Sequence, residues 1–296
     1  MKKFVCIDVG GTSIKYGLAL EDGIIIDKSS MDTEALEKGG FGILEKMKTI
    51  VKKYISDNNI SGICISTAGM VDHEAGKISY ALEHLIPNYT GMEIKKEIER
   101  EFSIRCEVEN DVNCAGLGEM WIGAGKDSKS SICMTIGTGI GGCVILDNKL
   151  IHGFSNSAGE IGYMNINGET FQDLASTTSL VKRVAKVKSI DEKDINGKII
   201  FDLAKNNDED CLNEINNMIK SLSIGIANIA YLINPQVIIL GGGIMAQEEF
   251  LKPKIEKELK NTLIPTVYNN TKIEFAKMQN DAGMLGALYN YLQKVY

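Results

Sequence analysis

The chain has 296 residues, of which 44% are hydrophobic, and its formal net charge is −7 at pH 7. This length and apolar content suffice for one large domain or two lobes with real cores. The acidic balance argues against a general affinity for nucleic acid or anionic membranes, because both favour clustered Lys and Arg.

Strands and helices alternate in the first half of the chain. Residues 4–9 form a β-branched run that ends at a glycine turn, and residues 16–20 resume after it, which predicts a strand pair. Apolar residues at helical spacing predict an amphipathic helix over 41–58. The next expected elements are a strand at 62–67, a helix at 91–102, a strand at 104–109 and a helix at 112–121. This alternation indicates an α/β lobe.

The second half repeats the opening pattern of strand, glycine turn and strand over residues 131–146. A polar stretch at 186–211 predicts a surface helical excursion. A long helix then ends at Asn234 and Pro235, and a strand at 237–240 opens onto three glycines. The chain therefore shows a weak internal duplication, which fits two lobes that share one cleft.

Gly10, Gly11 and Thr12 stand at the tip of the first strand pair. Such a turn exposes backbone N–H groups and a hydroxyl that suit a phosphate oxygen, although an ordinary hairpin turn has the same sequence. Asp8 at the same strand end could hold Mg²⁺, directly or through water.

Residues 137–142 match the pattern G-x-G-x-x-G, with Glu160 near the distance of a ribose-binding acid. A dinucleotide site needs a helix directly after these glycines, whereas residues 143–146 predict a strand. We therefore favour a second phosphate-binding hairpin over a Rossmann fold. The sequence contains neither a Walker A motif nor the protein-kinase motifs.

Asn110 and Asp111 lie where a strand ends and a helix begins, which is where open α/β sheets place ligands. Asp111 could accept the proton of an attacking hydroxyl, or it could cap the helix; spacing alone leaves both open. Downstream, the polar groups of His152, Asn156, Glu160 and Tyr163 suit sugar hydroxyls, although Glu160 could equally lie in a solvated turn.

The cysteines and histidines do not predict a metal cage. Seven cysteines are scattered among apolar neighbours without a C-x-x-C pair, which indicates reduced thiols in the cytoplasm. The three histidines, His73, His84 and His152, are not near a cysteine pair. No segment reaches the roughly 18 apolar residues of a membrane span. We therefore expect a soluble cytoplasmic protein.

Taken in order, these motifs resemble the ROK family (repressors, open reading frames and sugar kinases) of the actin-like ATPase superfamily, over nearly the whole chain. The segments that carry the resemblance are 8–12 and 136–142 for phosphates, 66–72, 86–89 and 158–162 for the sugar, 109–113 for the catalytic Asp, 240–243 for the nucleotide and 281–287 for a terminal helix. The resemblance implies a two-lobed, ribonuclease H-like α/β fold with a central nucleotide and sugar cleft. The expected lobes are 1–116, joined by a terminal helix at about 283–296, and 117–282.

The resemblance also implies a role for each matching residue. Asp111 is the expected general base, and Asp8 is expected near Mg²⁺. The expected sugar-binding residues are Gly69, Asn88, Asn110, Asp111, Glu160, Tyr163 and Gln172. The expected ATP-binding residues are Asp8, Gly10, Gly11, Thr12, Lys15, Thr138, Gly139, Gly242 and Gly243.

The sequence departs from the family pattern after Gly162. Most members have His there, followed by a cysteine cluster that binds zinc. Here Tyr163 replaces the His, residues 164–176 contain no cysteine, and Gln172 stands where a second sugar-contacting Glu is usual. These features resemble the zinc-lacking subset, which includes N-acetylmannosamine kinases and β-glucoside kinases. We therefore expect no zinc site.

The expected activity is ATP-dependent phosphorylation of the 6-hydroxyl of a hexose or N-acetylhexosamine. Segments 86–91 and 170–176 favour N-acetylmannosamine, with glucose or a β-glucoside as the runner-up. Family habit implies a homodimer. A sugar-sensing repressor is disfavoured, because the chain reaches Asp8 after seven residues, which leaves no room for a DNA-binding domain, and because it is acidic. A silent sugar-binding module is disfavoured because Asp111 and both glycine hairpins are present.

Overall fold

The computed structural model describes residues 1–56 and 58–296, which separate into two compact units. Unit 1 comprises Met1–Lys126, His152–Ala158 and Asn280–Tyr296, and unit 2 comprises Asp127–Ile151 and Gly159–Gln279. Among the described residues, no helix has both the length and the apolar character needed to cross a membrane.

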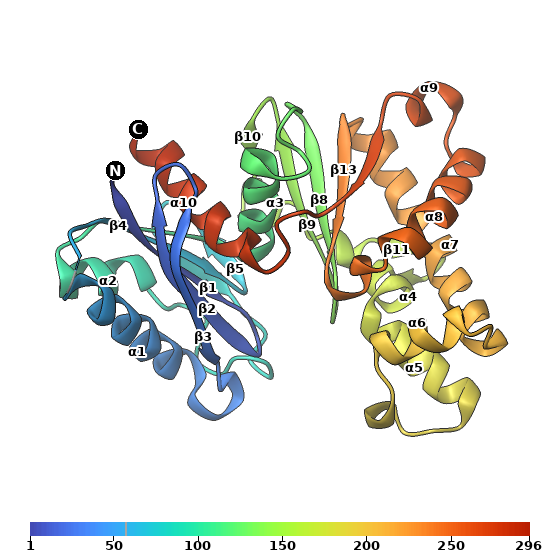
Figure 1. Ribbon diagram of the computed structural model, residues 1–296, viewed down its shortest axis with the longest axis horizontal. Coiled ribbons are helices and arrows are strands. Elements are labelled where there is room, and N and C mark those ends of the chain that lie inside the picture. The colour runs from blue at the N-terminus through green and yellow to red at the C-terminus, as the bar shows by residue number, and fades with distance from the viewer. Residues whose placement is uncertain (57) are drawn as a thin grey trace. The chain divides into compact units, whose positions relative to one another are not determined.

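Unit 1 is built on a five-stranded sheet with the strand order β3-β2-β1-β4-β7 (Figure 1). The strands are β1 (Lys3–Val9), β2 (Ser13–Leu20), β3 (Ile25–Asp32), β4 (Ile60–Thr67) and β7 (Cys106–Asn110), with a separate hairpin of β5 (Met70–Asp72) and β6 (Lys77–Tyr80). The helices are α1 (Ala35–Ile55), α2 (Ile94–Phe102), α3 (Asp111–Ile122) and α10 (Ala282–Val295), which follows the short helix η4 (Gln279–Asp281). β1 pairs antiparallel with β2 and parallel with β4, and β4 pairs parallel with β7.

The two faces of this sheet bury different clusters, because side chains alternate along a strand. In β1, Val5 and Ile7 join the core that α1 and α2 complete, whereas Phe4 and Cys6 join a second cluster. That second cluster includes α10 residues, among them Tyr291. The last helix of the chain therefore covers one face of the first strands. In Figure 1 the two chain ends lie close together in this unit, and Lys2 Nζ lies 3.8 Å from the centre of the Tyr296 ring.

Unit 2 contains a second five-stranded sheet, with the order β10-β9-β8-β13-β14. Its strands are β8 (Ser131–Ile136), β9 (Ile140–Leu146), β10 (Lys149–Leu150), β13 (Val237–Gly241) and β14 (Lys272–Phe275), with a small hairpin of β11 (Asn165–Ile166) and β12 (Glu169–Thr170). Its helices are η1 (Ile161–Tyr163), α4 (Phe171–Ala175), α5 (Thr177–Lys188), η2 (Glu192–Asp194), α6 (Gly197–Lys205), α7 (Glu209–Ile233), η3 (Gly243–Ala246), α8 (Glu248–Thr262) and α9 (Pro265–Tyr268).

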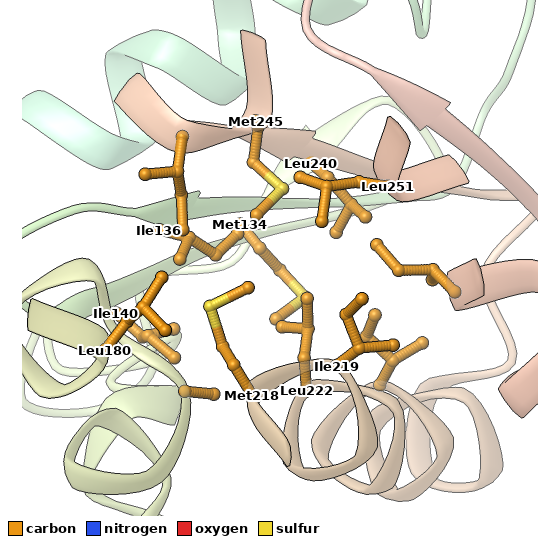
Figure 2. Close-up of a cluster of buried hydrophobic side chains, with 14 of the residues drawn as sticks. Met134, Ile136, Ile140, Leu180, Met218, Ile219, Leu222, Leu240, Met245 and Leu251 are labelled. Carbon is orange, nitrogen blue, oxygen red and sulfur yellow. The ribbon is translucent and has the colours of Figure 1, made fainter. Parts of the chain in front are cut away.

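The core of unit 2 lies between its sheet and the long helix α7. Figure 2 shows Met134 and Ile136 of β8 above Met218 and Leu222 of α7, with Leu240 of β13 in the same cluster. The flexible Met side chains fill the irregular gaps between the branched ones. This packing holds β8, and with it the turn that follows Ile136, in a fixed position.

The two sheets have the same topology, in which three antiparallel strands are followed by two parallel ones. The duplication that the glycine turns indicated is therefore present in the strand order. The strand β9 begins at Ile140 and pairs antiparallel with β8, so no helix follows the glycines of residues 137–139. This excludes the Rossmann alternative.

The unit boundary lies further along the chain than expected. The sequence placed it near residue 116, but all of α3 belongs to unit 1, as does the segment 152–158. The physical reason is the packing of α3 on α10, where an added Cβ on Gly118 would lie 2.7 Å from the backbone oxygen of Ala282. Helices in such close contact belong to one packed layer.

Candidate active site

Asp8 lies near the carboxyl end of β1, in register with Ser66 of β4. The Ser66 hydroxyl donates a hydrogen bond of 2.6 Å to Asp8 Oδ1. Burial raises the pKa of Asp8, against the opposing effects of Ser66 and the nearby charge of Lys15. Gly283 at the start of α10 packs directly on this carboxylate, since an added Cβ there would lie 2.4 Å from it. The sequence alone gives Ser66 no role of its own, although residues 66–72 carry part of the family resemblance.

Asn110 and Asp111 have different structural roles at the start of α3. Asn110 is the N-cap, because its Oδ1 accepts hydrogen bonds of 3.0 Å from the backbone N–H groups of Val112 and Asn113. Its Nδ2 donates to Gly69 O and to Asp111 Oδ1, each at 3.0 Å. The cap function therefore belongs to Asn110. Asp111 is the first residue of the helix.

The electrostatic environment of Asp111 disfavours its charged form. Burial, followed by the like charge of Asp8, raises the pKa of Asp111 to about 7, although hydrogen bonds from the backbone of Val112 and from Asn110 oppose the shift. A carboxyl group with this pKa can both accept and release a proton near neutral pH. The structure therefore gives Asp111 the property that a general base needs.

Hydrogen bonds hold the backbone of the turn after β1, and the space next to Gly11 is open. Gly10 N donates to Ser13 O at 3.0 Å, and Thr33 braces the turn through its hydroxyl to Gly10 O at 2.7 Å and its backbone N to Thr12 O at 2.9 Å. An added Cβ on Gly11 would meet nothing within 4 Å. No sequence signal indicated Thr33. Lys15 on β2 donates a hydrogen bond of 3.0 Å to Asn280 Oδ1.

The remaining predicted sugar residues of unit 1 lie in two places. Gly69 has a φ of 96°, which only glycine adopts readily, and its carbonyl accepts the bond from Asn110. Asn88 is exposed, and its backbone N donates to Glu83. Its neighbour Tyr89 is buried and shares a hydrogen bond of 2.6 Å with Thr67 at the end of β4. Gly69 and Asn110 are thus in contact, whereas no hydrogen bond joins Asn88 to them.

A cluster of histidines lies beside the same strand end. His152 Nε2 lies 2.8 Å from Glu109 Oε2, and the His73 ring stacks on the His152 ring with centroids 3.5 Å apart. Burial would raise the pKa of Glu109, but hydrogen bonds, first from His152, hold it below its usual range. Because these histidines come from distant segments, the sequence alone does not reveal this cluster.

In unit 2, predicted sugar residues and predicted phosphate residues line one pocket of about 270 Å³. The sugar group is Glu160, Tyr163 and Gln172. The phosphate group is Thr138, Gly139 and Gly242. Desolvation raises the pKa of Glu160, and residue Tyr163 is 54% exposed.

Gln172 connects the two walls of this pocket. Its Oε1 would lie 2.7 Å from a Cβ on Gly139 and 3.0 Å from one on Gly162. The amide therefore fills the space that these glycines leave open. Gly242, with a φ of 104°, approaches Ile136 O so closely that any side chain would clash.

A larger cavity of about 770 Å³ begins at the same turn. Apolar side chains of α5, α6 and η3 form part of its wall, and polar groups surround them; the lining includes Thr138, Thr177, Val181, Lys193, Ile195, Asn196, Lys198, Phe201, Gly243, Ile244 and Gln247. The backbone N–H of Thr177, the first residue of α5, donates to Gly137 O at 2.9 Å, so the start of α5 adjoins the turn. The Thr177 hydroxyl is buried and has no partner among the described residues. The size of this cavity and its lining of apolar and polar groups are typical of a small-molecule site.

Asp8 and Asp111 are oxygen donors of the kind that Mg²⁺ prefers. Their pKa values are both raised, Asp8 chiefly by burial and Asp111 by burial and by the charge of Asp8. A divalent cation would relieve the repulsion between the two groups. The residues present therefore fit a magnesium ion.

The paired sheets and the strand-end carboxylates define the class of protein. Two α/β units of one topology, each with a glycine turn after its first strand, form the actin-like ATPase fold, as the sequence predicted. The chain belongs to the ROK family, whose model matches residues 4–294.

Several similar proteins are named as sugar kinases or were solved with a sugar bound. The β-glucoside kinase of Listeria innocua is 33% identical over 99% of this chain and 98% of its own. A ROK family protein from Streptococcus pneumoniae, solved with sucrose, is 30% identical, with a TM-score of 0.85 over 99% of this chain and 98% of that chain. A ROK family glucokinase from Streptomyces griseus, solved with glucose and AMPPNP, is 25% identical, with a TM-score of 0.82 over 97% of this chain and 98% of that chain.

Proposed function

We propose that this protein is an ATP-dependent kinase that phosphorylates the 6-hydroxyl of a hexopyranose. The observation that carries the proposal is the pocket of unit 2, where Glu160, Tyr163 and Gln172 share a wall with the glycine turn at Gly139. Side chains that suit sugar hydroxyls thus adjoin backbone N–H groups that suit phosphate oxygens. The glucokinase solved with glucose and AMPPNP supports the same pair of ligands.

Each group of residues has a separate task in this reaction. The cavity beside Thr177 would hold the base and ribose of ATP, with phosphate at the adjoining turn of Gly137 and Thr138. The turn that contains Gly11 keeps its predicted role in phosphate binding. The sugar oxygen attacks the γ-phosphorus while the bond from that phosphorus to the β-phosphate oxygen breaks, and the hydroxyl proton passes to Asp111. Mg²⁺, held near Asp8 directly or through water, would offset negative charge on the phosphates.

We favour a β-glucoside as the acceptor sugar. The 33% identical relative from Listeria innocua is a β-glucoside kinase. N-acetylmannosamine, which the sequence favoured, is the second candidate. Its support is the neutral pair of Tyr163 and Gln172 on the pocket wall, which can bond an N-acetyl group without placing a carboxylate near its carbonyl.

The test is a coupled ADP-release assay across cellobiose and other β-glucosides, glucose, N-acetylmannosamine, N-acetylglucosamine, mannose and fructose. We expect the highest kcat/KM with a β-glucoside, because a site that bonds a particular substituent rejects analogues without it. A higher kcat/KM for N-acetylmannosamine would transfer the assignment to the second candidate. If the protein forms no ADP from ATP with any of these sugars but calorimetry detects sugar binding, the protein is a binding module and the kinase proposal fails.

We also propose a homodimer. Light scattering of the purified protein measures its mass directly, and a mass near 32.4 kDa, that of a single chain, would contradict the proposal.

A further inference from the structure

The cluster of His73, Glu109 and His152 brings together three metal-binding side chains from separate segments of unit 1. His73 follows β5, Glu109 is the penultimate residue of β7, and His152 begins the segment 152–158. One ligating atom of each residue lies within 4.8 Å of those of the other two. Among the described residues this is the one group of three or more such side chains at metal-binding distance.

The carboxylate of Glu109 is held in a fixed orientation. Its Oε1 accepts hydrogen bonds from the backbone N–H of Asn110 at 2.8 Å and from Asn113 Nδ2 at 3.0 Å. Its Oε2 faces His152 Nε2. Such outer bonds are what orient a ligating carboxylate, and they leave one oxygen for a cation. Glu109 is fully buried, so its charge needs a close positive partner.

His73 adds a donor atom that the protein itself does not use. Its Nδ1 is buried and has no hydrogen-bond partner within residues 1–56 and 58–296. A buried polar atom without a partner costs free energy unless a water or an ion satisfies it. The stacking on His152 keeps the ring beside the Glu109 carboxylate.

The positively charged side chain of Lys294 lies near the cluster but bonds to other groups. Lys294 Nζ donates to the backbone oxygen of His73 at 2.7 Å, and it lies 3.5 Å from Glu107 Oε2. Lys294 therefore pairs with Glu107, while the contact of Glu109 Oε2 is with His152 Nε2.

We propose that His73, Glu109 and His152 bind one Zn²⁺ ion. Two histidines and one carboxylate form a donor set that zinc favours, with a fourth position for water. Ligand atoms on tetrahedral zinc lie about 3.3 Å apart, given bonds of about 2.0–2.1 Å. The distance of 2.8 Å between Glu109 Oε2 and His152 Nε2 would therefore increase slightly, and the His73 ring would turn towards the ion. Zinc would take the place of the hydrogen bond between Glu109 and His152.

The bound ion would join the β5–β6 turn, the end of β7 and the segment 152–158. Because Glu109 directly precedes Asn110 and Asp111, it would also stiffen the backbone at the expected general base. The site lies outside the segment after Gly162, where the sequence predicted that zinc is absent. This proposal therefore replaces the broader expectation of a protein without a zinc site.

The test is a titration of the chelator-treated, reduced protein with Co²⁺ and Zn²⁺, with Mg²⁺ in large excess to fill oxygen-rich sites. We expect one Co²⁺ per chain, displaced by Zn²⁺, with visible absorption of a nitrogen and oxygen site and without the near-ultraviolet band of cobalt–thiolate bonds. His73→Ala and His152→Ala should each weaken binding by about 100-fold or more, since losing a ligand exceeds the 10–100-fold effect of losing an outer-shell partner. The control is His84→Ala, because His84 is exposed and lies outside the cluster.

If either alanine variant fails to fold, the corresponding glutamine variant takes its place, and hydrogen exchange of the wild-type protein provides a second measurement. Zinc should raise amide protection in residues 73–76 and 152–158. Absence of stoichiometric binding, equal affinity in either cluster variant and in His84→Ala, or unchanged protection on zinc addition would overturn the proposal. All these readouts are independent of kinase activity.

Discussion

The carboxyl group of Asp111 has a pKa of about 7, because burial and the charge of Asp8 disfavour its ionised form. Replacing it with asparagine keeps the shape of the side chain but removes the proton acceptor. We expect Asp111→Asn to lower kcat by about 10²-fold or more, with an unchanged circular dichroism spectrum. The matched control is Asp22→Asn in the turn after β2, which should keep wild-type kcat. Near-normal turnover of Asp111→Asn would contradict its role as the base.

The raised pKa also sets a pH dependence. Since the base must be ionised, kcat/KM should rise with pH up to about 7 and then level off. Asp8→Asn removes the like charge, so the pKa of Asp111 should fall and the acidic limb of the profile should move to lower pH. The folded protein holds the Asp111 proton more tightly than the unfolded chain does. This group's contribution to stability therefore declines as pH rises from about 4 to about 7.

The measurement is the pH profile of kcat/KM for both proteins, alongside denaturant unfolding at several pH values. An acidic limb that stays in place in Asp8→Asn would mean that Asp8 does not act on Asp111.

At the level of the elements, the packing of α7 against α4 depends on a glycine. An added Cβ on Gly225 would lie 2.2 Å from the Phe171 ring of α4, which is fully buried. Gly225→Ala should therefore destabilise the protein by about 1–3 kcal/mol, although alanine favours helices. Thermal or denaturant unfolding measures the change. Asn216→Ala, at an exposed position of the same helix, is the control and should be close to neutral; a stabilised Gly225→Ala would show that Phe171 can move away.

The sequence predicted elements well where periodicity was regular and poorly where glycine interrupted it. The expected helix at 41–58 begins at Ala35 in the structure, because α1 continues past Gly39, whose φ of 58° marks a kink. Gly39 closely approaches Pro87 O, which explains why glycine stands there. The helix α5 and its cap at Ser176 were not predicted. The sequence also did not indicate that this helix begins beside the turn at residues 137–139.

The site was predictable to the extent that its residues follow strand ends. Asp8 and Asp111 could be found in this way. That Asn110, and not Asp111, caps α3 became clear only from the structure. Thr177 and Asn196 line the large cavity from segments that sequence alone does not bring to Gly137. The contact between His73 and His152 was equally invisible, because it depends on how distant segments fold back.

At the scale of the whole molecule, unit 1 depends on the last helix of the chain. Met284, Leu288 and Tyr291 of α10 are buried in the cluster that contains Phe4 and Cys64. Removing residues 282–296 should expose this face, so we expect hydrogen exchange in β1 and β4 to accelerate strongly and protease to cut unit 1. Removal of Tyr296 alone is the control and should preserve protection. Retained protection in the longer truncation would show that the sheet of unit 1 is stable without α10.

The position of α10 also has a consequence for biosynthesis. A ribosome makes the strands of unit 1 before unit 2, and makes the helix that covers them only after unit 2. Domains tend to fold as units during translation. Unit 2 can therefore complete its core while the nascent chain still lacks α10, and the apolar face of β1 and β4 stays uncovered until α10 has been made. This interval is when a chaperone would have most to bind, and when premature termination would leave the largest aggregation-prone surface.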